Sequence, residues 1–144
     1  MKPIVVGIDN SPQSDAVLAS AVDLAQRYHR KLIIIHAVPD STHVPAEVLR
    51  VSPTEASDTW ARIARDALTR RTAAISPELI ERVDALIGTP WQVLCDAARD
   101  NGAGLVVIGT HGRTAIDTLL GTTATRVVNH APCSVFVVRA GGPK

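Results

Sequence analysis

The stretch LVVIGTHGRTAIDTLLGTT, from Leu105 to Thr123, decides the fold class of this chain. It opens as an apolar run of β type, enters a loop that contains Gly109 and Gly112, and resumes at Gly121 before a helical pattern. Glycines let backbone N–H groups approach an anion, and a helix N-terminus adds unpaired donors and partial positive charge. The stretch therefore predicts a strand, a phosphate-binding loop and a helix, with a nucleotide as the ligand.

The same alternation of strand-like and helix-like segments runs through the rest of the chain. Strands are expected at residues 3–8, 31–38, 79–87, 105–108 and 134–139, and helices after Ser11, at 52–74, at 89–101 and at 122–129. Parallel neighbours need crossover connections, so this order predicts a single doubly wound α/β domain with helices on both faces of a five-stranded parallel sheet. The domain is expected to span residues 1–140, with residues 141–144 as a disordered tail.

Two helix starts carry capping signals. Ser11 is placed to cap the first helix with Pro12 at its first position, and Ser52, Pro53 and Glu55 form a capping box for the second. The second helix is expected to bury one apolar face. That face comprises Trp60, Ile63, Ala64, Ala67 and Leu68.

Composition narrows the classes of partner. The chain has 144 residues, of which 46% are hydrophobic, and 15 Lys and Arg balance 14 Asp and Glu. This balance argues against nucleic acid and anionic membranes as main partners. The apolar run at residues 4–8 is too short for a membrane span or a signal-peptide core, so a cytoplasmic protein is expected. Cys95 and Cys133 lack the spacing of a zinc site.

Ligands of such sheets bind beyond the carboxyl ends of the strands, where the strand order reverses. Asp9 follows the first strand, and Gly109 ends the fourth. A carboxylate beside phosphate donors would hold a ribose hydroxyl or a Mg²⁺ ion that bridges phosphates. Two alternatives stay open: Asp9 only caps the first helix, and Arg113 lies in solvent instead of pairing with a phosphate.

Four segments together resemble the universal stress protein family over nearly the whole chain. They are VGIDNS at 6–11, LIIIHAV at 32–38, GTPWQVLCDAARDNGAGLVVIGTHGRT at 88–114 and LLGTTATRVVNHAPCSVFVVR at 119–139. The resemblance implies a Rossmann-like fold with strand order 3-2-1-4-5. It also implies a homodimer formed through the last strand, by Val135, Phe136, Val137 and Val138.

One branch of that family binds ATP through the pattern G-x2-G-x9-G-S/T, and the resemblance carries its positions onto this chain. Gly109, Gly112, Gly121 and Thr122 match the pattern. The resemblance further places Gly7, Ile8 and Asp9 at the nucleotide, the Ala37 backbone at the adenine, and Ile108 and Thr123 in the pocket wall. Eight residues, Arg113 to Leu120, separate Gly112 from Gly121, where the pattern has nine. Such a deletion is either absorbed by the loop or weakens binding.

Three functions are compatible with these residues. The first is a cytoplasmic homodimeric stress-response protein that binds ATP, with or without Mg²⁺, and regulates by binding, with at most slow hydrolysis. The second is a dimeric protein-interaction module that binds no nucleotide. The third is an enzyme of the nucleotide α-hydrolase or nucleotidyl-transfer type that uses Thr110 and His111, for which no second acid or base is evident. The protein partner and the stress signal are not predicted.

Overall fold

The computed structural model describes residues 1–38, 40, 52–110 and 120–139. The expected loop residues at 111–119 and the expected tail at 141–144 lie outside this part of the chain. The elements, in chain order, are β1 (Ile4–Ile8), α1 (Gln13–Tyr28), β2 (Leu32–Val38), α3 (Pro53–Arg71), the 3₁₀ turn η1 (Pro77–Leu79), β3 (Ile80–Ile87), α4 (Pro90–Asp100), β4 (Leu105–Gly109), α5 (Thr122–His130) and β5 (Ser134–Val138).

The five strands form one parallel sheet in the order β3-β2-β1-β4-β5, so the predicted fold class and strand order are confirmed. β1 lies at the centre, where Val6 pairs with Ile34 of β2 on one side and with Val107 of β4 on the other. All three of these side chains are fully buried. This explains why β1, β2 and β4 are apolar on both faces: strands inside a parallel sheet are covered on both sides.

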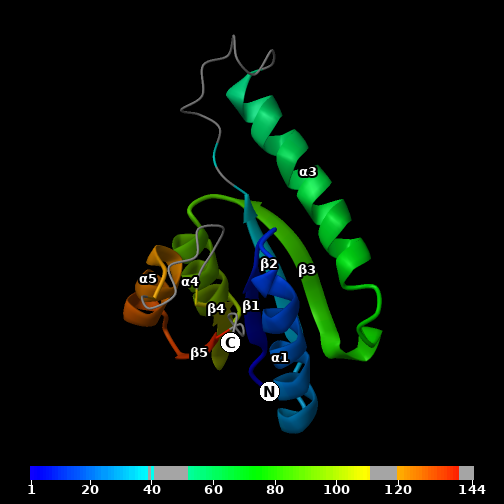
Figure 1. The fold of residues 1–144 in the computed structure, drawn as a ribbon, viewed down its shortest axis with the longest axis vertical. Coiled ribbons are helices and arrows are strands. Elements are labelled where there is room, and N and C mark those ends of the chain that lie inside the picture. The colour runs from blue at the N-terminus through cyan, green and yellow to red at the C-terminus, as the bar shows by residue number, and fades with distance from the viewer. Residues whose placement is uncertain (39, 41–51, 111–119, 140–144) are drawn as a thin grey trace.

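Two hydrophobic cores lie on opposite faces of the sheet. Val6 of β1 packs with Val17 of α1 and Leu68 of α3. Val5, the next residue along the strand, packs with Leu94 of α4 and Val127 of α5. Figure 1 shows the same division, with α1 and α3 on one side of the sheet and α4 and α5 on the other. Successive side chains of a strand point to opposite faces of the sheet and thus pack into the two different cores.

Helix α3 begins as its capping signal predicts, but its apolar face is only partly covered. The Ser52 hydroxyl accepts the Glu55 N–H at 3.2 Å, and the Glu55 carboxylate accepts the Ser52 N–H at 3.2 Å. Leu68 is buried, whereas Trp60 and Ile63 are 41% and 58% exposed. The prediction that the whole face is buried was therefore wrong. Periodicity shows that a helix has an apolar face, but which partner covers that face depends on the tertiary arrangement.

The predicted start of α1 needs a correction as well. The helix begins at Gln13, with Pro12 at its N-cap, and no side chain caps it. Ser11 does not take the expected role. It lies in the turn before the helix, where its N–H donates to the Asp9 carboxylate at 2.8 Å.

Candidate functional site

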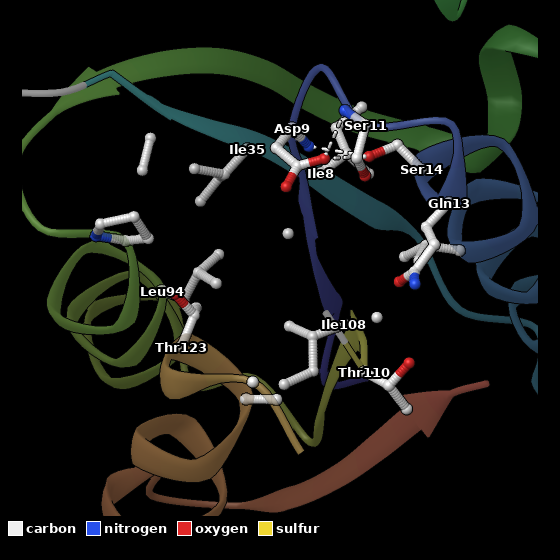
Figure 2. Close-up of a pocket in the computed structure, with 17 residues that line it drawn as sticks. Ile8, Asp9, Ser11, Gln13, Ser14, Ile35, Leu94, Ile108, Thr110 and Thr123 are labelled. Carbon is white, nitrogen blue, oxygen red and sulfur yellow. Dashed lines mark hydrogen bonds between the residues drawn. The ribbon is translucent and has the colours of Figure 1, made fainter. Parts of the chain in front are cut away.

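A cavity of about 110 Å³ opens at the carboxyl ends of β1 and β4. β1 is paired with β2 on one side and β4 on the other, so this is the point where the sheet order reverses. Figure 2 shows the side chains around the cavity, with Asp9 and Ser14 across from Leu94 and Thr123. The cavity is lined by eight residues that the sequence nominated: Gly7, Ile8, Asp9, Ala37, Ile108, Gly109, Gly121 and Thr123.

One nominated residue in the described part of the chain does not line this cavity: Thr122 is exposed at the start of α5. Gly112 and Arg113 lie outside the described residues, as does His111 of the enzyme hypothesis. Thr110 of the enzyme hypothesis also lines the cavity, and sequence reasoning missed eight further lining residues: Ser11, Gln13, Ser14, Val17, Ile35, Pro90, Leu94 and Ala124. For Ser14 the signal was available, because a hydroxyl five residues after Asp9 is placed in the first turn of α1. For Leu94, 87 positions after Gly7 in the chain, there was none.

Asp9 is held by the first turn of α1. One carboxylate oxygen, Oδ1, accepts the Ser11 N–H at 2.8 Å and the Ser14 hydroxyl at 2.9 Å, while the Asp9 N–H donates to Ser14 Oγ at 2.9 Å. Figure 2 shows the other carboxylate oxygen pointing toward the cavity. Burial by itself raises the pKa of Asp9, but hydrogen bonds from Ser11 and Ser14 and the field of His36 outweigh it, so the pKa is lowered. Asp9 is therefore an anionic acceptor at neutral pH.

Helix N-termini add partial positive charge to the cavity, opposite in sign to the charge of Asp9. Residues from the first turns of α1, α4 and α5 line the cavity, and no side chain caps any of the three helices. The first N–H groups of a helix have no intrahelical partner, and they carry partial positive charge. At α5 the Gly121 N–H donates to the Thr110 carbonyl at 2.7 Å. The donors that α5 offers to an anion are therefore those of the residues after Gly121.

Gly7 is required for packing beneath the cavity. A Cβ atom at this position would lie 2.6 Å from Leu94 Cδ1 and 3.3 Å from Ile108 Cγ2. Leu94 of α4 can reach β1 only because Gly7 has no side chain, and Leu94 itself lines the cavity. The glycine thus sets the shape of the cavity floor.

A second hollow of about 460 Å³ adjoins the cavity and shares Asp9 and Ala37 with it. The ends of β1 and β2 form one wall, with Asn10, His36 and Val38. The apolar face of α3 forms the other wall, with Trp60, Ile63, Ala64 and Ala67. The exposed face of α3 therefore borders the candidate site. The sequence did not indicate this position of α3.

Within residues 1–38, 40, 52–110 and 120–139, no group of three or more His, Cys, Asp or Glu side chains is arranged to hold a metal ion. Burial raises the pKa of both the Cys95 and the Cys133 thiol. In the same residues, no helix has the length and apolar character needed to cross a membrane.

One family model covers nearly the whole chain. The family model described as the universal stress protein family matches residues 1–139. The chain belongs to the universal stress protein family. This confirms the resemblance on which the site residues were nominated.

Relatives of this universal stress protein align along nearly its full length. A putative universal stress protein of Staphylococcus epidermidis is 29% identical over 142 residues, which cover 96% of this chain and 84% of the relative. The solved structure of universal stress protein UspA from Lactobacillus plantarum has a TM-score of 0.80 and 31% identity, covering 96% and 97% of the two chains. A universal stress protein solved in complex with cAMP has a TM-score of 0.67 and 26% identity, covering 95% and 96%.

In this universal stress protein, Arg71 ties the end of α3 to the site. Its Nη1 donates to the Asp9 carbonyl at 2.9 Å, and its Nη2 lies 2.8 Å from Asp15 Oδ1. The side chain is 28% exposed, so these hydrogen bonds are partly shielded from water. They join residues 62 and 56 positions apart in the chain.

We expect Arg71→Met to lower the free energy of unfolding by about 1–2 kcal/mol, because it removes a charge-assisted hydrogen bond to the Asp9 carbonyl and keeps most of the apolar stem. Urea denaturation of both proteins measures the difference. Arg70→Met is the matched control, since Arg70 is an exposed neighbour on the same helix. Equal effects of the two substitutions would show that the contact to Asp9 contributes nothing.

Proposed function

We propose that this universal stress protein binds an adenine nucleotide, with ATP as the ligand, at the carboxyl edge of its sheet. The observation that carries the proposal is the cavity between the anionic Asp9 and the uncapped N-terminus of α5. A nucleotide needs both characters, since its ribose hydroxyls donate hydrogen bonds and its phosphates accept them. The relative in complex with cAMP supports an adenine nucleotide as the class of ligand.

The cavity is too small for a whole nucleotide, so we assign the parts of the nucleotide to the cavity and the adjoining hollow. Pockets for ligands of this kind usually measure about 300–1,000 Å³, so the cavity of 110 Å³ takes only part of the molecule. The phosphates are assigned to the first turn of α5, with Thr122 and Thr123, and the ribose to Asp9. The base then extends past Ala37 into the adjoining hollow. If the phosphates carry Mg²⁺, Asp9 is the carboxylate among the lining residues that can face it.

The proposed biological unit is a cytoplasmic homodimer. β5 is an edge strand, and Phe136 on it is 42% exposed. An edge strand offers unpaired backbone groups, so pairing of Val135 to Val138 with the same strand of a second copy would remove the edge. The proposed role is regulation by nucleotide binding, because the described lining residues hold Asp9 as the acidic group and add no second acid or base for turnover.

Thermal unfolding with and without ligand tests the proposal. We expect Mg-ATP at a hundredfold excess over its Kd to stabilise the protein by about 2.7 kcal/mol, which corresponds to a rise in Tm on the order of 5–10 °C. Cyclic AMP and ADP are compared with GTP to measure base preference. The proposal fails if no adenine nucleotide raises Tm while calorimetry also shows no heat of binding.

A second candidate is a dimeric interaction module that binds no nucleotide. Two observations favour it: the Gly121 N–H is already bonded to the Thr110 carbonyl, and the cavity is small. Under this function, Tm does not respond to any nucleotide, and size-exclusion chromatography still shows a dimer.

A further inference from the structure

The apolar wall that α3 presents to the adjoining hollow carries an aromatic ring. Trp60 lines this hollow and is 41% exposed. The wall continues along the helix through Ala64, one turn further on, and Ala67. Across the hollow lie the ends of β1 and β2, with Asn10 and Val38. A tryptophan that faces a concave space, rather than a packed core, has a large ring face available to a ligand.

The hollow and the cavity share two lining residues, Asp9 and Ala37. The β1–β2 pairing ends at Ile8 and His36, so Ala37 extends past the end of β1 and borders both spaces. A ligand whose phosphates lie at α5 and whose ribose lies at Asp9 reaches the hollow by extending past Ala37 toward α3. The group that arrives there is flat and aromatic.

Resting on the proposed function, we infer that Trp60 stacks on the base of the bound nucleotide, so that α3 is part of the binding site. Every base has an aromatic face, and stacking on a protein ring is tolerant of base identity. Trp60 thus adds affinity for nucleotides over phosphate-only anions. A polar base edge fits this hollow because Asn10 and His36 lie on its rim, whereas the α3 wall is apolar. A second protein copy would need a broad, flat apolar surface of about 800 Å² per partner. The space beside α3 is instead a concave hollow of about 460 Å³.

Isothermal titration calorimetry of the full chain tests this inference with two ligands, Mg-ATP and inorganic tripolyphosphate. We expect Trp60→Leu to weaken ATP binding roughly tenfold, because it keeps an apolar side chain and removes the ring. Trp60→Phe, which keeps a ring, should cost less than about threefold. Neither substitution should change the affinity for tripolyphosphate.

Fluorescence supplies an independent readout, because the chain has two tryptophans. Trp91 packs against His130, with ring centroids 4.8 Å apart, and lies under the Arg126 guanidinium at 5.6 Å, so it is not part of the hollow. In a Trp91→Phe variant, only Trp60 emits. We expect ATP to quench this emission and tripolyphosphate to leave it unchanged.

The outcomes separate the two proposals. If ATP binds the wild type and Trp60→Leu with equal affinity, or binds without quenching Trp60, the stacking inference is overturned and the proposed function stands. If ATP gives no heat with the wild type, both are overturned. Circular dichroism melting of Trp60→Leu and Trp60→Phe shows that the variants are folded, which a partly exposed helix position should permit.

Discussion

Replacing Thr123 with Asp should reduce ATP affinity about a hundredfold without loss of stability. Thr123 lines the cavity in the first turn of α5, where the phosphates are assigned. A carboxylate about 5 Å from a phosphate charge costs roughly 3 kcal/mol at an effective dielectric constant of about 20. The same carboxylate interacts favourably with the helix dipole and should raise the free energy of unfolding by about 0.3–1 kcal/mol.

The opposite signs of these two effects make the experiment decisive. Calorimetry measures the affinity, and urea denaturation without ligand measures stability. Thr125→Asp is the control, since Thr125 is exposed on the same helix and does not line the cavity. Thr123→Asp binding ATP as tightly as Thr125→Asp would place the phosphates elsewhere.

Replacing Asp9 with Ala is expected to lower the free energy of unfolding by about 3 kcal/mol or more at neutral pH. The substitution removes the carboxylate that accepts the Ser11 N–H and the Ser14 hydroxyl, and hydrogen bonds to charged groups contribute about 1.5–3 kcal/mol each when they are shielded. The same change should abolish the rise in Tm that ATP produces. Asp23→Ala is the control, because the Asp23 side chain is exposed and pairs with Arg27 one turn along α1. It should cost no more than about 0.5 kcal/mol.

The effect of Asp9 on stability should depend on pH in the acid range. The folded-state pKa of Asp9 lies below its ordinary value of 3.8, so the unfolded chain takes up the proton first as pH falls. The ionised carboxylate therefore stabilises the fold above pH 3.8, and this contribution is lost as pH falls through the folded-state pKa. We expect the difference in unfolding free energy between wild type and Asp9→Asn to be constant near neutral pH and to shrink in acid. A difference that grows as pH falls would mean that burial, not hydrogen bonding, controls this carboxyl group.

The sequence predicted some of the residues that line the cavity and not others, and the difference has a physical cause. Asp9 and Gly109 were accessible because each follows an apolar strand, and strand ends of a parallel sheet meet at one edge. Trp60 was assigned to the core because an apolar residue at helical spacing is the same in sequence whether it faces the sheet or a hollow. How α3 packs against β2 and β3 decides whether the residue faces the sheet or the hollow. The spacing of apolar residues along the helix carries no information on that packing.

The start of α1 was not fixed by its capping signal. Ser11 precedes Pro12 as a cap would, but it lies in the turn before the helix, where the Asp9 carboxylate accepts its N–H. At α3 the same signal formed the predicted capping box of Ser52 and Glu55. A serine before a proline therefore indicates a helix start, but it does not by itself decide which residue caps the helix.

The amino-acid sequence by itself determined the fold class, because a strand covered on both faces must be apolar throughout and parallel strands must alternate with helices. It also predicted the edge of the sheet at which the structure has a cavity. Only the tertiary structure decided that Leu94 closes onto Gly7, that Arg71 holds the Asp9 carbonyl and that the apolar face of α3 borders the site. The first two contacts join residues more than 50 positions apart, and the geometry of all three depends on how helices pack on the sheet, which no local pattern specifies.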